Sequence, residues 1–229
     1  DTTIEVVAGN GLGKDFKSKM RIAATLGAKI VGCNFGFLMR PEKISTLMEW
    51  NTHMEKCTNR LKELAPIAKS MGLKIAVENH FDFTAEEMRR MIETVDSPNV
   101  GVLFDIGNVV GTLDDPIIAA DILGPLTVAT HYKDFAIEET EKGFRFCMVP
   151  LGYGSLRLRE ITEKLLTHID SNVCLTIEML NGQNFEVDWL KKGFWEPFDE
   201  KPVHEVTATL RHIRSKKINY DEYILLDEV

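Results

Sequence analysis

Four residues able to bind a divalent cation stand at the ends of four successive apolar runs in the sequence. Each run has the length and composition of a buried β-strand, and the residues that close them are Glu78, Asp105, His131 and Glu178. A polar side chain at the carboxyl end of a buried parallel strand faces the mouth of the sheet, where active sites are built. Three carboxylates and one imidazole at such positions predict a site for one divalent metal ion.

The donor set indicates both the ion and its chemistry. Oxygen and imidazole ligands suit Mn, with Mg or Co as alternatives, and the lack of thiolates argues against a structural zinc site. A metal with open positions can bind two neighbouring oxygens of a hydroxy-carbonyl compound and stabilise an enediolate as a Lewis acid. Proton transfer next to a carbonyl also needs a base on one face and an acid on the other, and a carboxylate whose pKa is moved by burial can serve as either.

Each of these residues has a simpler interpretation when it is taken alone. A single acidic residue at a strand end is more often a helix cap or a loop anchor than a metal ligand. Four in succession are hard to reach by chance, so the metal site is favoured for the set. The loop from Gly9 to Gly13 resembles a phosphate-binding loop, but it lacks the Lys-Ser/Thr of a P-loop and is interpreted as a turn.

An alternation of strand-like and helical segments must position these residues. Strand-like runs end near Ala8, Phe35, Glu78, Asp105, His131 and Glu178. Apolar residues at spacings of three or four mark helices between them, and Thr84 with Glu87 forms a capping box that opens one of these helices. The alternation predicts a parallel sheet with helices outside it. Six strands would satisfy an open doubly wound sheet, but ligands from four consecutive strands suit a closed (β/α)8 ring better.

Composition excludes several other classes of protein. The chain has 229 residues, of which 44% are hydrophobic, which suits one sizeable core and is short for two domains. The formal net charge is -8 without any basic run, and no apolar run has membrane-spanning length, so binding to nucleic acid or a membrane is not expected. The cysteines contain no CxxC pair and are interpreted as buried reduced thiols, which favours a cytoplasmic location.

Longer motifs surround the four candidate ligands. They are Val77-Glu78-Asn79-His80, Asn99-Val100-Gly101-Val102-Leu103-Phe104-Asp105, His131-Tyr132-Lys133-Asp134, Pro150-Leu151-Gly152-Tyr153-Gly154 and Leu175-Thr176-Ile177-Glu178. As a group they resemble the xylose-isomerase-like TIM-barrel superfamily of sugar isomerases and epimerases, where they form strands five to eight. The resemblance covers roughly residues 4 to 180 and implies a (β/α)8 TIM barrel whose first two βα units are absent from this sequence.

From the resemblance we expect further residues before Asp1. We also expect a barrel domain over residues 1–182, and a C-terminal extension over residues 183–229 that packs on the barrel or on a partner subunit.

The resemblance implies a divalent-metal-dependent isomerase or epimerase that acts on a sugar, polyol or keto-sugar by proton transfer next to a carbonyl. In epimerases of the family two metal-binding glutamates exchange the protons, and by position these are Glu78 and Glu178. Substrate contacts are expected from His80, Asn108, Lys133 and Tyr153. Members often carry His at the position of Asn108 and Glu at the position of Tyr153, so the residues that contact the substrate differ in this chain.

Alternatives remain at the level of residues and of function. His80 can equally be a hydrogen-bonded core histidine, Lys133 can form a salt bridge with Asp134 or another acid, and His212 is expected at the surface of a helix. The reaction can be that of a lyase of the same superfamily, namely a dehydratase or a C-glycoside-cleaving subunit, or the barrel can be a non-catalytic binding subunit. The expected partner is a small carbohydrate-like molecule, and aromatic residues between 189 and 198 favour a homo-oligomer or a complex.

Overall fold

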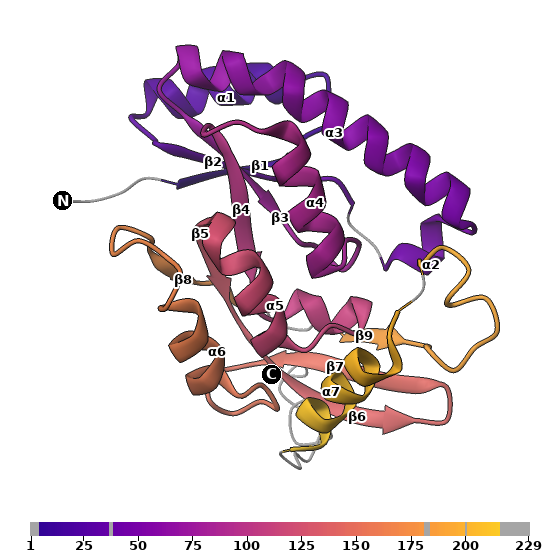
Figure 1. The fold of residues 1–229 in the computed structure, drawn as a ribbon. Coiled ribbons are helices and arrows are strands. Elements are labelled where there is room, and N and C mark those ends of the chain that lie inside the picture. The colour runs from indigo at the N-terminus through magenta and orange to yellow at the C-terminus, as the bar shows by residue number, and fades with distance from the viewer. Residues whose placement is uncertain (1–4, 37–38, 181–183, 200, 216–229) are drawn as a thin grey trace.

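The computed structural model describes residues 5–36, 39–180, 184–199 and 201–215. In this part of the chain six parallel strands form one sheet, in the order β1-β2-β3-β4-β5-β8 (Figure 1). The strands are β1 (Glu5–Asn10), β2 (Ile30–Asn34), β3 (Lys74–Glu78), β4 (Val100–Asp105), β5 (Thr127–Tyr132) and β8 (Leu175–Ile177). Because β2 contacts β5 although two strands lie between them, the sheet is curled into part of a barrel.

The strand order settles the choice between the two parallel architectures. Each strand pairs with the strand that precedes it in the sheet order, and all five pairings are parallel. A doubly wound sheet would reverse its order at a switch point. The prediction of a TIM-barrel-type sheet is therefore confirmed for these six strands, whereas residue 4, where the resemblance begins, lies outside the described residues.

Helices α1 (Phe16–Thr25), α3 (Leu47–Ser70), α4 (Ala85–Val95) and α5 (Pro116–Leu123) pack against strands of the main sheet, and α6 (Leu158–Leu165) packs against α5. The other helices are α2 (Arg40–Lys43) and α7 (Val203–Arg214), and the 3-10 turns are η1 (Asn108–Thr112) and η2 (Gly124–Leu126). Figure 1 draws α7 below the main sheet. The predicted capping box at the start of α4 is confirmed: the Thr84 hydroxyl accepts from the Glu87 amide and the Glu87 carboxylate accepts from the Thr84 amide.

A small antiparallel sheet follows directly from the end of β5. It consists of β6 (Asp134–Thr140), β7 (Gly143–Val149) and β9 (Asn184–Val187). Phe146 of this sheet packs between Phe135 and Phe185, and Phe185 also contacts Phe81 of the loop after β3. The small sheet therefore packs against the carboxyl end of the barrel, where the strand-end residues lie.

The two faces of the main sheet carry different side chains. Outward-facing residues such as Val77 belong to the main hydrophobic core that joins the sheet to the helices. Inward-facing Ala76 and Leu103 belong to a separate small cluster inside the sheet. Since side chains alternate along a strand, Glu78 and Asp105, each two residues further along, share this inner face.

Helix α7 is joined to the barrel by buried polar contacts. Thr209 Oγ1 donates to Leu113 O at 2.7 Å, and His212 Nδ1 lies 3.2 Å from Asp115 Oδ2. His212 Nε2 accepts from the Arg157 amide at 3.1 Å. The expectation of a surface position for His212 was wrong, because this histidine is the contact through which α7 reaches the capping residue of α5.

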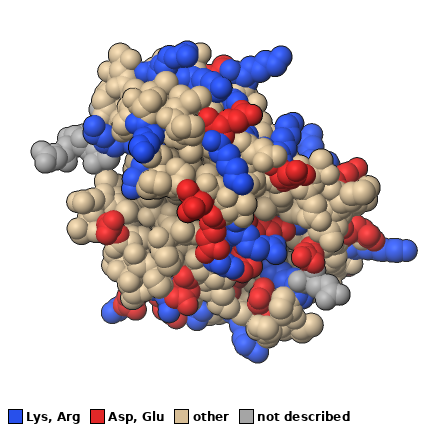
Figure 2. All heavy atoms as spheres, turned by 45° about the horizontal axis from the view of Figure 1, so that its top comes forward, with Lys and Arg blue, Asp and Glu red and all other residues tan. Residues whose placement is uncertain are grey.

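Two further features concern the surface. Cys33, Cys57 and Cys147 are buried as expected, but Cys174 is exposed, because it precedes β8 at the edge of the sheet. On the face shown in Figure 2, acidic and basic side chains are interspersed. None of the helices in the described ranges combines the length and apolar character needed to cross a bilayer.

Candidate metal centre

Neighbouring strand ends deliver the four candidate ligands. Glu78 ends β3, Asp105 ends β4, and His131 lies one residue before the end of β5. Asp105 and His131 are direct partners in the parallel ladder. Glu178 follows β8, and its amide extends the pairing by donating to Tyr132 O at 2.9 Å. The register of the sheet therefore brings together residues that are far apart in the sequence.

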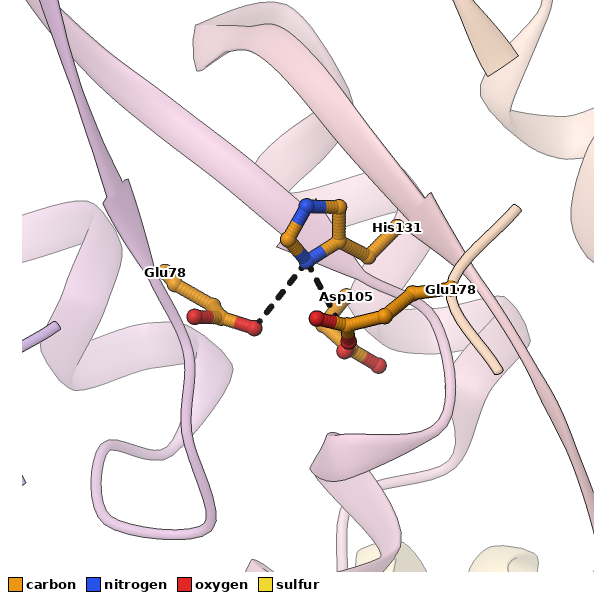
Figure 3. Close-up of side chains that lie close together, drawn as sticks. All are labelled: Glu78, Asp105, His131 and Glu178. Atoms are coloured by element: carbon orange, nitrogen blue, oxygen red, sulfur yellow. Dashed lines mark hydrogen bonds and ion pairs between the residues drawn. The ribbon is translucent and has the colours of Figure 1, made fainter. Parts of the chain in front are cut away.

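The four side chains converge on one point inside the sheet. One potential ligand atom from each lies within 4.8 Å of the others. His131 Nδ1 is 3.2 Å from Glu78 Oε1 and 3.5 Å from Glu178 Oε2. Figure 3 shows Glu78 on one side of the imidazole, with Asp105 and Glu178 on the other. Ligands on opposite sides of a divalent ion lie about 4–5 Å apart, so this spacing fits one ion.

Lys133 supplies positive charge to the cluster. Its Nζ is 2.6 Å from Asp105 Oδ2 and 2.6 Å from Glu178 Oε2, and the side chain is buried. Three carboxylates therefore face one lysine, and with a neutral His131 the ionised cluster carries excess negative charge. A divalent cation would balance that charge, which is a second respect in which the residues fit a metal ion.

For four ionisable groups of the cluster, burial and the attraction of oppositely charged neighbours shift the pKa in opposite directions. Burial opposes the ionised form of Glu78, but the hydrogen bond with His131 and the charges of His80 and Lys133 outweigh it and lower the pKa. Burial and the charge of Glu78 raise the pKa of Asp105 despite the attraction of Lys133. Burial also disfavours the cations of His131 and Lys133, yet the surrounding carboxylates raise the pKa of both. The cluster thus favours bound positive charge.

Backbone contacts fix the orientation of Asp105. Its Oδ1 accepts from the amides of Gly107 and Asn108, each at 3.0 Å. The Asn79 side chain makes two hydrogen bonds to the backbone of Asp105. Its Nδ2 donates to Asp105 O at 2.8 Å, and its Oδ1 accepts from Asp105 N at 2.9 Å. One carboxylate oxygen is thereby held in the turn while Oδ2 faces the cluster, as a preorganised ligand requires.

The predicted substrate residues lie at different depths. Lys133 is buried in the cluster, where it pairs with Asp105 and Glu178. Asn108 is fully buried, and neither side-chain polar atom has a hydrogen-bond partner among the described residues. His80 is half-buried. Tyr153 is 64% exposed, so the structure does not bring it into the buried cluster.

Asp134, which the sequence analysis considered only as a salt-bridge partner, organises the loop beside the cluster. Its two carboxylate oxygens accept from four backbone amides, those of Phe135, Gly152, Gly154 and Leu156. A Cβ at Gly154 would overlap this carboxylate, so glycine is required there. The signal in the sequence was an acidic residue three positions after the predicted strand end at His131, together with two glycines in the later loop from Pro150 to Gly154.

Asn34 is a further residue that sequence reasoning missed. It ends β2 as Glu78 ends β3, and its side chain is buried. The same rule that selected Glu78 would have found it, but the predicted strand was extended by one residue to Phe35.

Comparison with known proteins gives a matching family and several relatives. A family model described as a xylose isomerase-like TIM barrel matches residues 9–211. The uncharacterized protein YihM of Escherichia coli (strain K12) is 24% identical over 172 residues, which are 67% of this chain and 51% of YihM. An inosose dehydratase of Bacillus thuringiensis (strain Al Hakam) is 26% identical over 141 residues, which are 60% of this chain and 46% of the dehydratase. The chain spans about half the length of these curated relatives.

Solved structures share the fold. A crystal structure of the IOLI protein with a bound zinc atom has a TM-score of 0.59 at 20% identity, covering 95% of this chain and 77% of that chain. Structures of D-psicose 3-epimerase with D-tagatose from Clostridium cellulolyticum H10 give 0.59 at 18% identity, covering 95% of this chain and 79% of that chain. At these identities the similarity establishes the TIM-barrel fold.

Proposed function

The chain belongs to the xylose isomerase-like TIM barrel family, and on that premise we propose that it carries the site of a divalent-metal-dependent isomerase or epimerase. The supporting observation is the convergence of Glu78, Asp105, His131 and Glu178 within 4.8 Å. The proposed ion is Mn, with Mg or Co as alternatives. Zinc is added as a further alternative because the similar IOLI protein binds it. The proposed substrate is a sugar, polyol or keto-sugar, since relatives include an inosose dehydratase and a D-psicose 3-epimerase.

Two carboxylates are placed to move protons in this proposal. When bound, the ion supplies Lewis-acid polarisation of a hydroxy-carbonyl group. Glu78 and Glu178 approach the cluster from β3 and from the end of β8, on two sides of His131 (Figure 3). One carboxylate removes the proton next to the carbonyl and the other returns a proton on the opposite face. Glu78 is held by His131 and Glu178 by Lys133, so both side chains are oriented. In each turnover one of them begins ionised as the base and the other begins protonated as the acid.

The proposed substrate contacts are His80, Asn108, Lys133 and Tyr153. An ammonium group has three donors, and Lys133 directs Nζ at two carboxylates, which leaves one donor for a substrate oxygen. Asn108 is the strongest of the others, because its buried amide lacks a partner among the described residues. Tyr153 would contribute from the exposed side of the loop that Asp134 holds.

A lyase is the second candidate function. The 26% identity with an inosose dehydratase favours it, as do the Asn108 and Tyr153 positions, where this chain departs from the isomerase pattern. Elimination of water also begins with proton removal next to a carbonyl, so the same carboxylates would serve. The two functions differ in whether the substrate retains its hydroxyl group.

One experiment tests both candidates. Full-length protein loaded separately with Mn, Mg, Co or Zn is incubated in heavy water with D-tagatose, D-psicose, D-fructose and an inosose. Isomerisation or epimerisation places deuterium at the carbon next to the carbonyl, whereas dehydration yields a product that has lost water. Turnover should be abolished by chelation, reduced by about 10²–10⁴-fold in Glu178→Gln, and retained in Glu141→Gln, a control at an exposed glutamate. Metal-free protein with full activity would refute the proposal.

We also propose the division of the chain into a barrel over residues 1–182 and an extension over residues 183–229. In the described part of the extension, α7 contacts the barrel through Thr209 and His212. Assembly into a homo-oligomer or a complex is a further proposal, which sedimentation of the full-length protein would test.

A further inference from the structure

Asn34 carries a buried polar atom that has no hydrogen-bond partner among the residues that the structure describes. The residue is 4% exposed, and its Oδ1 accepts no hydrogen bond within the described ranges. The backbone carbonyl is satisfied, because Asn34 O accepts from the Gly11 amide at 2.9 Å. Nearly all buried polar atoms in folded proteins are hydrogen-bonded. A buried polar atom that lacks a partner in the protein is often one that binds a ligand or a water molecule.

The alternation of side chains places Asn34 on the inner face of the sheet. Val31 and Cys33 belong to the outer hydrophobic core. Gly32 faces inward, because a Cβ built on it would lie 3.1 Å from Cδ1 of Leu103, a member of the inner cluster. Asn34, two residues beyond Gly32 on the same strand, therefore points to the inside.

The register places the Asn34 side chain beside the proposed metal centre. Cys33 pairs with Val77 in the parallel ladder between β2 and β3, so Asn34 is level with Glu78. Glu78 shares the inner face with Ala76. The amide of Asn34 and the carboxylate of Glu78 therefore project from neighbouring strands, on the same face and at the same end of the sheet.

Asn79 shows how a structural asparagine is satisfied in this region. It is 1% exposed, and its side chain makes both hydrogen bonds to the backbone of Asp105. In the part of the chain that the structure describes, Asn34 lacks such a partner for Oδ1, and Asn108 lacks one for both polar atoms of its amide. Asn34 and the proposed substrate residue Asn108 thus each carry a buried amide atom without a partner among the described residues, whereas the Asn79 amide is fully used.

We propose that Asn34 is a substrate-binding residue whose amide binds a hydroxyl group of the compound held at the metal cluster. An amide can both donate and accept, which matches a neutral hydroxyl group. The amide is neutral and supplies no positive charge to pair with an anionic group, so an uncharged polyhydroxylated compound suits this position better than an anion. The inference rests on the proposed function and extends it by one residue and by the charge of the substrate.

Two asparagine variants of the full-length protein form a matched test. In Asn34→Leu a side chain of similar size replaces an unsatisfied amide, so Tm should stay within about 2 °C of wild type or rise. In Asn79→Leu two backbone groups of Asp105 lose their partners, so Tm should fall by roughly 5–10 °C. A fall in Asn34→Leu as large as that in Asn79→Leu, or failure to fold, would show a structural asparagine and overturn the inference.

Binding measurements supply the second readout. Mn content is measured first, and Asn34→Leu should retain the wild-type content while Glu178→Gln loses it. The affinity of the Mn-loaded protein for D-tagatose, with D-psicose in parallel, should fall about tenfold in Asn34→Leu, as expected for one lost hydrogen bond. Equal affinity of wild type and Asn34→Leu, with Mn retained, overturns this inference and leaves the proposed function intact. If the wild type binds none of Mn, Mg, Co and Zn, the proposed function itself is refuted.

Discussion

Two buried clusters of charge in this molecule differ in how completely their groups are satisfied. In the first, the Arg40 guanidinium forms a bidentate pair with the Glu87 carboxylate at 2.7 and 2.9 Å. Its remaining donors reach Pro197 O and Asp82 O, so all five are used. In the second, the proposed metal centre, three carboxylates surround one lysine and one histidine.

Ring contacts complete the first cluster. The guanidinium carbon of Arg40 lies 3.7 Å from the ring centre of Trp50 and 4.0 Å from that of Phe198. Trp50 Nε1 donates to Glu87 Oε1 at 2.8 Å. One positive and one negative charge cancel, and the fold itself supplies every partner. Buried charged groups alone therefore do not identify a functional site. An excess of negative over positive charge, and polar groups without partners, are the features that indicate one.

The largest effect that would separate the clusters is on turnover. Glu178→Gln should reduce turnover by about 10²–10⁴-fold, because it removes both a proposed ligand and a proposed proton-transfer group. The stability of the metal-free protein should stay the same or rise, since one excess negative charge disappears. Kinetics at saturating metal and urea unfolding of the metal-free protein measure the two quantities. A variant that is inactive only because it is unfolded would contradict the assignment.

Breaking the first cluster should have the opposite outcome. Arg40→Met leaves the Glu87 carboxylate buried without its cation, so the free energy of unfolding should fall by about 3–5 kcal/mol. Metal content and turnover per folded molecule should be close to wild type. Urea unfolding followed by metal analysis checks both. If Arg40→Met retains full stability but loses metal, the division into a structural and a functional cluster fails.

Metal binding should stabilise the fold through the second cluster alone. At free Mn of about 100 times its dissociation constant, the folded state gains about 2.7 kcal/mol, or roughly 5–10 °C in Tm. Arg40→Met should show the same gain from its lower starting Tm, and Glu178→Gln should show almost none. Thermal unfolding across a Mn titration measures the gain. An equal gain in Glu178→Gln would mean that Mn binds elsewhere.

The smallest expected effect concerns Asp82, which lies between the two clusters. Burial raises the pKa of Asp82 to about 8 from its ordinary 3.8, and the charge of Glu78 adds to the shift. The folded protein therefore holds this proton more tightly than the unfolded chain. The resulting stabilisation is complete below the ordinary pKa and is lost as the pH rises to about 8.

Asp82→Asn provides the measurement. The amide can keep the acceptor that Asp82 Oδ1 offers to the backbone of His80 and Phe83, and it does not titrate. Between pH 5 and pH 8 the metal-free variant should lose less stability than metal-free wild type, measured by urea unfolding. Parallel pH dependence of the two proteins would show that Asp82 does not hold the proton.

Prediction from the sequence succeeded where the cause is local. The end of β3 at Glu78 and the end of β4 at Asp105 agree with the structure, because apolar runs bounded by polar residues and turns define such strands. The capping box of Thr84 and Glu87 was also identified, because its two residues lie within one turn of helix. The prediction for His212 failed, because the helix pattern contains no information about a contact with Asp115, which lies 97 residues away in the sequence.

The sequence by itself determined the ends of β3 and β4, and that four possible metal ligands stand at or within one residue of strand ends. Only the tertiary structure decided which charges meet. The curl of the sheet joins Lys133 to Asp105 and Glu178, and the path of the C-terminal segment joins Arg40 to Pro197, 157 residues further along. Strand ends follow from local hydrophobic patterns, whereas the satisfaction of a buried charge depends on every segment that packs around it.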